Sequence, residues 1–135
     1  MNTNKSNNKK DIPILLITWR RPEHTLRSLY AALECKSKNI YVYNDGFSNN
    51  EEINKDIYKT RKLIIDYAKL YKNIIFKFNK NKSMGCKIGV TNAINWLFEN
   101  NEFGIIIEDD ILISDLFYKF CSHYINIDKE INLIS

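Results

Sequence analysis

Three consecutive acids, Glu108, Asp109 and Asp110, follow a short apolar run that begins at Phe103. The run is rich in isoleucine, which indicates a buried parallel strand with the three carboxylates at its carboxyl end. Carboxylates crowded in this way repel one another and lose hydration unless a positive partner is present. Mg²⁺ or Mn²⁺ would be such a partner, because hard cations take oxygen ligands and bridge to phosphates. The alternative is that one acid caps the next helix while the others face solvent.

Further charged residues follow the other apolar runs of the chain. Arg20 and Arg21 come after the first run, Asp45 comes after the second, and a lysine-bearing loop comes after the third; these strands are predicted over residues 12–18, 40–44 and 74–78. Ligands of parallel sheets bind outside the carboxyl ends of the strands, where the strand order reverses. Two arginines, a lone aspartate and an acidic cluster at one rim therefore predict a site for a phosphorylated ligand with a divalent metal.

Helical patterns separate these strands and decide the fold class. We predict helices that begin at Pro22, at a cap formed by Ser48 or Asn49, near Gly85, and at a cap formed by Ser114 or Asp115. The alternation predicts an α/β fold, a Rossmann-like three-layer sandwich with a mostly parallel sheet. We expect the strands that begin at Ile12 and Phe103 to be adjacent at the centre of the sheet, because they are the most continuously apolar. Residues 131–134 are expected to start another strand.

Composition sets the broad class of the molecule. At 135 residues, of which 44% are hydrophobic, the chain is long enough for one domain with a core. Residues 1–11 are polar and are predicted to be a disordered tail, which leaves 12–135 as the folded domain. The net charge of +4 comes from scattered lysines, so nucleic acid is not an expected partner. No apolar run is long enough to form a transmembrane segment. The three cysteines lack metal-type spacing, which predicts reduced thiols in a cytoplasmic protein.

The ordered landmarks resemble those of one enzyme family. An Ile-Pro-Ile-Leu-Leu-Ile run with Arg21 behind it, then Asn44-Asp45-Gly46, then Ile107-Glu108-Asp109-Asp110 stand in the order seen in glycosyltransferases of the GT-A fold. The likeness is to the N-acetylglucosaminyltransferase I type and its bacterial relatives, and it extends from Ile12 to about Tyr124. It covers the donor-binding half of such an enzyme only, so we expect the domain to be incomplete at its carboxyl terminus.

The resemblance implies a role for each matching residue. Arg21 would contact the nucleotide, and Asp45 would accept a hydrogen bond from the uracil ring of a UDP-linked sugar. Asp109 would contact the sugar or ribose, and Asp110 would coordinate Mn²⁺ or Mg²⁺ bound to the diphosphate. The family's third-helix histidine would fall near Thr91, so that contact is missing here. The catalytic base of the family lies downstream of the acidic triplet, and no residue here matches it. The acceptor, whether glycan, lipid or protein, is not identified by the sequence.

Each of these residues also has a plainer structural interpretation. Arg21 could pair with a surface carboxylate, and Asp45 could serve only as a turn former. Trp19 is expected to pack at the rim. The remaining cations are expected on solvated or partly exposed surfaces; they are Lys80, Lys82, Lys87, His24 and His123.

The predicted function is therefore that of a nucleotide-sugar glycosyltransferase or its donor-binding half. A non-catalytic nucleotide-binding domain is one alternative, because the same residues would serve it. A receiver-like signalling module is another, but it needs paired acids after the first strand, where this chain has Trp19-Arg20-Arg21. A sugar-nucleotide pyrophosphorylase needs a glycine-rich loop there, which is absent from the sequence. A homodimer would be one way for a short sheet to bury exposed surface.

Overall fold

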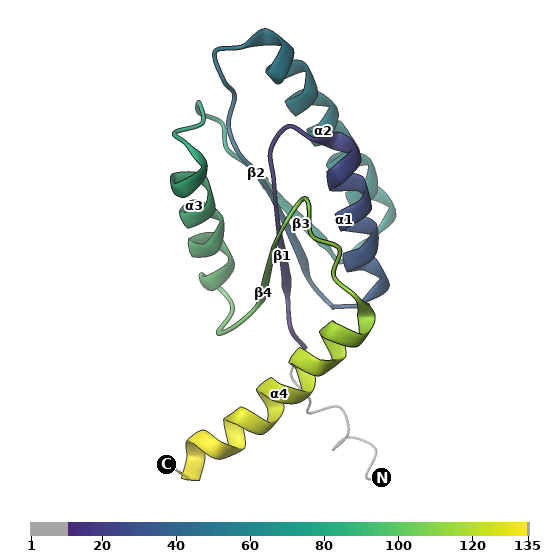
Figure 1. Ribbon diagram of the computed structural model, residues 1–135, viewed down its shortest axis with the longest axis vertical. Helices are drawn as coiled ribbons and strands as arrows, with labels where there is room; N and C mark the ends of the chain where they lie inside the picture. The colour runs from purple at the N-terminus through teal and green to yellow at the C-terminus, as the bar shows by residue number, and fades with distance from the viewer. Residues whose placement is uncertain (1–10, 135) are drawn as a thin grey trace.

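The computed structural model describes the backbone of residues 11–134 and the side chains of residues 11–127. Strands and helices alternate along the chain (Figure 1), and their bounds are β1 Ile14–Thr18, α1 Pro22–Glu34, β2 Ile40–Asn44, α2 Glu51–Leu70, β3 Ile74–Phe78, α3 Cys86–Phe98, β4 Ile105–Glu108 and α4 Asp115–Ile134. The predicted α/β fold is confirmed, and it is consistent with a Rossmann-like three-layer sandwich.

The sheet has four parallel strands in the order β3-β2-β1-β4. The chain builds outward from β1 through β2 to β3 and then crosses back, so that β4 pairs with the free side of β1. The strand order therefore reverses between β1 and β4, as the sequence predicted for the strands at Ile12 and Phe103.

The expectation that β4 lies at the centre of the sheet is wrong. Within the described residues β4 is an edge strand, because it pairs with β1 on one side and with no strand on its other side. Only Ile107 of β4 is buried, whereas Ile106 is 40% exposed. A run of isoleucines indicates a strand but does not tell whether one or both of its edges are paired.

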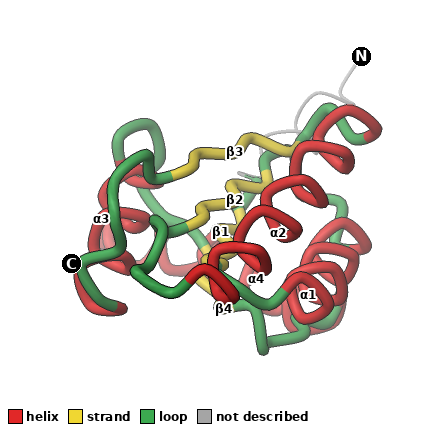
Figure 2. The backbone as a smooth tube through the Cα atoms, turned by 90° about the horizontal axis from the view of Figure 1, so that it is seen from above, coloured by secondary structure: helices red, strands yellow, loops and turns green. Residues whose placement is uncertain are grey.

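The helices lie on both faces of the sheet (Figure 2). The first two, α1 and α2, cover one face and α3 covers the other. The larger core lies under α1 and α2 and contains even-numbered residues of the central strands, such as Ile14, Leu16 and Val42. A smaller core lies under α3 and contains Leu15 and Leu97, among others. Both faces of β1 are therefore buried, which explains why its sequence is apolar without alternation.

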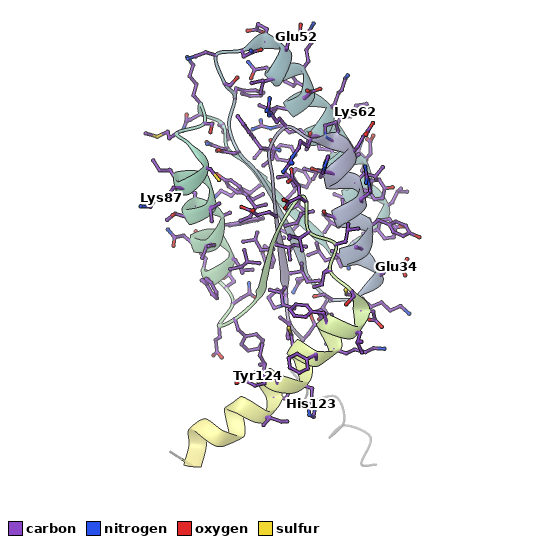
Figure 3. The ribbon with its side chains drawn as sticks, in the orientation of Figure 1. Glu34, Glu52, Lys62, Lys87, His123 and Tyr124 are labelled. Atoms are coloured by element: carbon purple, nitrogen blue, oxygen red, sulfur yellow. The ribbon has the colours of Figure 1, made fainter. Side chains whose placement is uncertain are left out.

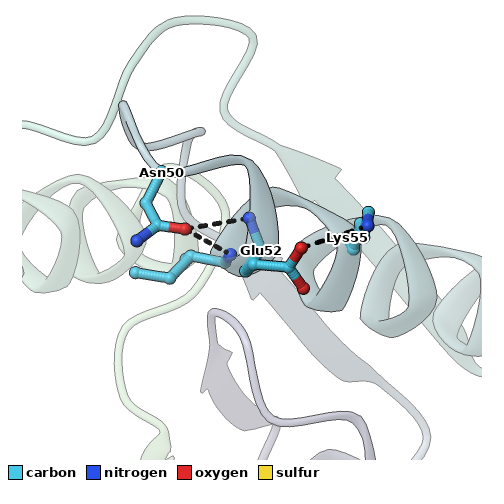
Figure 4. Close-up of polar contacts among 4 residues, drawn as sticks. Asn50, Glu52 and Lys55 are labelled. Atoms are coloured by element: carbon cyan, nitrogen blue, oxygen red, sulfur yellow. Dashed lines mark hydrogen bonds and ion pairs between the residues drawn. The ribbon is translucent and has the colours of Figure 1, made fainter.

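The first turn of α2 differs from the prediction by one or two residues. Its cap is Asn50, whose side-chain oxygen accepts hydrogen bonds from the backbone N–H groups of Glu52 (2.8 Å) and Ile53 (3.2 Å) (Figure 4). Ser48 was one of the two predicted caps, but its hydroxyl accepts from the Asn50 N–H instead. The turn before the helix therefore decides which residue is the cap. The sequence does not identify that residue, because several neighbouring residues have side chains that can cap a helix.

The last helix, α4, lies near the amino ends of the strands, and Figure 1 shows its later turns extending beyond the sheet. Ser114 caps it as predicted, because its hydroxyl accepts from the Phe117 N–H at 3.0 Å. The buried Tyr118 donates its hydroxyl to the Ile12 carbonyl at 2.9 Å. The helix continues to Ile134, so the predicted strand over 131–134 is wrong. None of the described helices is long and apolar enough to cross a membrane.

The predicted disordered tail falls largely outside the described residues, which begin at Asp11. The Asp11 carboxylate accepts hydrogen bonds from the Ser37 hydroxyl (3.1 Å), the Lys38 backbone N–H (2.9 Å) and the Tyr118 hydroxyl (3.2 Å). Asp11 thus joins the loop before β2 to α4.

Leu16 gives a test of the central position of β1, because its side chain is fully buried in the larger core. We expect Leu16→Ala to lower the free energy of unfolding by about 2–5 kcal/mol, measured by urea denaturation. Leu116→Ala is the matched control, because Leu116 is 79% exposed, and we expect it to change stability by no more than about 0.5 kcal/mol. Equal losses in the two variants would contradict the core described here.

Candidate functional site

A pocket of about 420 Å³ opens at the carboxyl ends of β1 and β4, at the point where the strand order reverses. Three of the predicted site residues, Arg21, Asp45 and Asp109, lie together in it, and the fourth, Asp110, is not among its lining residues. We call this cavity the rim pocket; its lining residues are Ile17, Thr18, Trp19, Arg20, Arg21, Asp45, Ser83, Gly85, Cys86, Gly89, Val90, Glu108 and Asp109. Charged residues that follow β1, β2 and β4 thus meet at one rim, as expected, and their roles in binding stay predictions.

Arg21 and Asp109 form an ion pair within the rim pocket. An Arg21 Nη donates to Asp109 Oδ1 at 2.6 Å, and the Asp109 side chain is only 7% exposed. The Ser28 hydroxyl of α1 donates to the Asp109 backbone carbonyl at 2.6 Å, which fixes the turn after β4. The partner of Arg21 is therefore a buried acid of the same pocket rather than a surface carboxylate. The guanidinium supplies the positive charge that a buried carboxylate requires.

The two neighbouring acids differ from Asp109 in exposure. Glu108 is the last residue of β4, is exposed and lines the rim pocket, although the sequence gave it no role. Asp110 is exposed in the turn that follows. Neither acid caps a helix, because α4 begins at Asp115 and its cap is Ser114, four residues after Asp110. Helix capping, which was the structural alternative to a metal site, is therefore excluded for Glu108 and for Asp110.

Glu108 and Asp110 are the acids that could bind a metal ion at this rim. Among the described residues, no group of three or more histidine, cysteine or acidic side chains is close enough to hold a metal ion. Mg²⁺ does not require such a group, because it is commonly held by one or two carboxylates together with substrate phosphates and water. Glu108 and Asp110, both free of the ion pair that occupies Asp109, offer oxygen ligands of the kind that Mn²⁺ and Mg²⁺ prefer.

Asp45 is the most heavily bonded acid of the pocket. Its Oδ1 accepts hydrogen bonds from the Gly46 N–H (2.7 Å) and the Asn79 side-chain amide (3.1 Å), and its Oδ2 accepts from the Ser83 hydroxyl (2.7 Å). Asp45 is only 7% exposed. It is therefore a turn former that also lines the pocket, so the turn interpretation is confirmed, and the contact with the nucleotide base stays a prediction. Oδ2 retains acceptor capacity beyond its one bond, since a carboxylate oxygen has two lone pairs.

The loops after β2 and β3 approach each other closely over Asp45. Phe47 and Lys82 form an isolated parallel bridge, and the Ser83 N–H donates to the Phe47 carbonyl at 2.8 Å. A Cβ placed on Gly46 would stand 1.9 Å from the backbone carbonyl oxygen of Asn81. Only glycine fits at this position, because the clash would be with backbone that cannot rotate away.

Side-chain hydrogen bonds of Trp19 and Asn44 connect the loops after β1 and β2. The sequence predicted no role in the site for Asn44. The Trp19 indole N–H donates to the Gly46 carbonyl at 2.8 Å. The fully buried Asn44 donates its side-chain amide to the Trp19 carbonyl (2.9 Å) and to the Thr18 hydroxyl (3.0 Å). The Asn-Asp-Gly turn signal pointed to this loop, but the partner of the Asn44 side chain depends on the pairing of β1 with β2.

The five cations that the sequence predicted on solvated or partly exposed surfaces lie outside the rim pocket. Lys80, Lys82 and Lys87 are exposed and do not line it, and Figure 3 shows Lys87 on the outer side of α3. His24 and His123 are also exposed, and Figure 3 shows His123 on α4, at the other end of the sheet. The expectation of a solvated role for these residues is confirmed.

The three cysteines are free thiols that differ in environment. Cys86 is exposed at the first position of α3 and lines the rim pocket, whereas Cys121 on α4 is partly buried. Cys35 is buried, and the loss of hydration there raises the pKa of its thiol to about 11. Burial also raises the pKa of the Cys121 thiol. The pocket therefore contains one accessible sulfur atom.

A comparison of this chain with protein-family models finds no matching family, and a comparison with curated proteins finds no match. The resemblance to GT-A glycosyltransferases thus stays a prediction from the ordered motifs of the sequence.

Gly46 offers a test of the contact between the two loops. We expect Gly46→Ala to lower the free energy of unfolding by about 1–3 kcal/mol, because the loops after β2 and β3 must separate to admit the methyl group. Lys80→Ala, an exposed change in the neighbouring loop, should stay within about 0.5 kcal/mol of the wild type. Both values come from denaturant titration, and a Gly46→Ala protein as stable as the Lys80→Ala control would refute the close approach.

Proposed function

We propose that this chain is a nucleotide-sugar glycosyltransferase, or the donor-binding half of one, which binds a UDP-linked sugar in the rim pocket with a divalent metal. The observation that carries the proposal is the meeting of Arg21, Asp45 and Asp109 in one pocket at the switch point of a parallel sheet. Such pockets are where open α/β sheets bind their ligands. A cavity of about 420 Å³ is within the range of small-molecule sites.

The proposed roles follow from the chemistry of each side chain. Asp45 accepts the ring N–H of the base with the remaining lone pair of Oδ2. Arg21, whose side chain is 48% exposed although it pairs with Asp109, turns further N–H donors toward the diphosphate. Arg20 adds a second positive charge to the lining of the pocket. These groups bind and orient the donor; the base that activates the acceptor is not assigned.

The carboxylates after β4 complete the proposed site. Asp110, with Glu108 beside it, would hold Mn²⁺ or Mg²⁺ together with the phosphates of the donor. When bound, the metal would neutralise the charge of the diphosphate leaving group. Asp109 is held in place by Arg21 and Ser28, so its role is to contact the sugar or ribose from a fixed position.

The central prediction concerns the coupling between metal and nucleotide. We expect Mn²⁺ to raise the affinity for UDP by about 5- to 150-fold, because each ligand offsets the charge of the other. Asp110→Asn keeps the shape of the side chain but removes its charge, and should abolish most of this effect while the protein stays folded. The measurement is calorimetric titration of UDP with Mn²⁺ or with a chelator.

The matched control for that titration is Asp66→Asn, because Asp66 is an exposed acid on α2 that lies outside the rim pocket. Its substitution should leave the Mn²⁺ effect intact. The proposal fails if the wild type binds UDP equally well in the chelator, or if Asp110→Asn retains the full Mn²⁺ effect.

The thiol of Cys86 reports on ligand binding in the rim pocket without any substitution. We expect UDP with Mn²⁺ to slow the alkylation of Cys86 by iodoacetamide at pH 8, because the ligand would cover the side chain. Cys121 lies on α4 and is the internal control, so its rate should not change. Peptide mass spectrometry follows both sites in one sample. Equal protection of the two thiols would point to a general effect on the protein and would remove the support for binding in the pocket.

A further inference from the structure

Arg61 of α2 directs its guanidinium to the carboxyl rim of the sheet, where it meets three acceptors. Its Nε donates to Asn44 Oδ1 at 2.7 Å, and an Nη donates to the backbone carbonyls of Asp45 (3.0 Å) and Asn79 (2.8 Å). These acceptors belong to the ends of β2 and β3 and to the loops that follow them. Arg61 is not one of the residues that line the rim pocket.

Two aromatic rings hold the same guanidinium from its sides. The Arg61 Cζ lies 4.4 Å from the ring centroid of Phe47 and 4.9 Å from that of Phe78. Cations within about 6 Å of a ring centroid are attracted by the π face. Partial burial lowers the pKa of the guanidinium below its ordinary value. A charge withdrawn from water in this way is stable only where hydrogen bonds and rings replace its hydration.

Arg61 contacts the loops after β2 and β3 directly and is linked to the loop after β1 through Asn44. Asn44, which accepts from Arg61, donates in turn to the Trp19 carbonyl in the loop after β1. Asn79, whose carbonyl accepts from Arg61, donates its side-chain amide to the Asp45 carboxylate. One guanidinium therefore binds the backbone carbonyl of Asp45 and that of Asn79, whose side chain donates to the Asp45 carboxylate.

We propose that Arg61 is a positioning residue of the rim pocket, which holds Asp45 and the loop after β3 in the geometry that receives the base. The inference rests on the proposed function for the identity of the ligand, but the geometric part concerns the chain alone. A planar fork with five donors suits this task, because it reaches several fixed acceptors at once. Sites that are held in place before the ligand arrives bind more tightly than sites that the ligand must order.

The variants are chosen to separate shape, charge and bonding. Arg61→Met keeps an unbranched side chain near the two rings and removes all donors. Arg61→Lys restores a positive charge but cannot reach the three acceptors with a planar fork. Lys62→Met is the matched control, since Lys62 is the next residue of α2 and is exposed (Figure 3). Its ammonium group pairs with Asp66 and not with the rim.

The first readout is hydrogen exchange of backbone amides in the three variants. The Asn79 N–H donates to the Asn44 carbonyl at 2.9 Å and the Ser83 N–H donates to the Phe47 carbonyl at 2.8 Å, so both amides report on the rim. We expect Arg61→Met to speed their exchange by about tenfold or more, while the amides of β1 exchange as in the wild type. A role in global stability alone would speed the rim and β1 amides by the same factor, and that result would overturn the inference. Unchanged rim exchange in folded Arg61→Met would overturn it as well.

The second readout is the affinity for UDP in the presence of Mn²⁺. Arg61→Met should weaken it by about tenfold, Arg61→Lys should recover part of the loss, and Lys62→Met should match the wild type. If Arg61→Met does not fold, Arg61→Lys provides the same comparison, with intermediate exchange at Asn79 and Ser83. If the wild type does not bind UDP, the proposed function fails, while the exchange pattern still decides whether Arg61 positions the rim. Full affinity in Arg61→Met with faster rim exchange would refute the positioning of the base site.

Discussion

The buried carboxylate of Asp45 needs hydrogen-bond donors, and the rest of the rim is built to supply them. A buried charge without partners would be too costly to keep. Its donors come from its own turn, from Asn79 at the end of β3, and from Ser83 in the loop beyond. To bring Asn79 and Ser83 to Asp45, the loop after β3 must run close beside the loop after β2, and this close approach is possible because residue 46 is glycine. The position of α3 then follows, since α3 begins directly after that loop.

The ion pair of Arg21 and Asp109 balances the charge of a second buried acid in the rim pocket. The two residues lie far apart in the sequence and meet because β1 and β4 are paired in register, with Ile17 opposite Glu108. Arg21 therefore supplies the positive partner that stabilises Asp109, the buried member of the acidic triplet. The case for a cation therefore rests on the two exposed acids and on the phosphates they would share, which is a narrower basis than the triplet as a whole.

The fold could be predicted in most of its parts because each strand of this chain is a separate apolar run between polar loops. The bounds of β2 and β3 agree with the sequence prediction, and the Pro22 start of α1 was marked by proline itself. The edge position of β4 could not be predicted, since pairing between strands is not a property of a single run. The cap of α2 was misplaced because Ser48, Asn49 and Asn50 are chemically alike, and only the turn geometry chooses among them.

The candidate site was predictable to the extent that its residues stand directly after strands. Arg21, Asp45 and Asp109 were found by that rule. Arg61 was missed because it stands in the middle of a helix among lysines, where a sequence offers no means to tell a surface cation from one that reaches the rim. Asn44 was missed because a strand-ending asparagine is usually part of a turn, and its hydrogen bonds to Thr18 and Trp19 exist only once the strands are paired.

The outer side of β4 leaves backbone N–H and C=O groups without a strand partner within the described residues, and Ile106 beside them is 40% exposed. On α4, an apolar stripe formed by Leu116, Phe120 and Tyr124 is exposed as well. An open edge next to exposed apolar side chains is a template for the addition of another strand. Neither Ile106 nor the stripe on α4 lines the rim pocket. Substitutions at this edge and on this stripe would therefore change the exposed apolar surface of the described residues without changing a residue that lines the rim pocket.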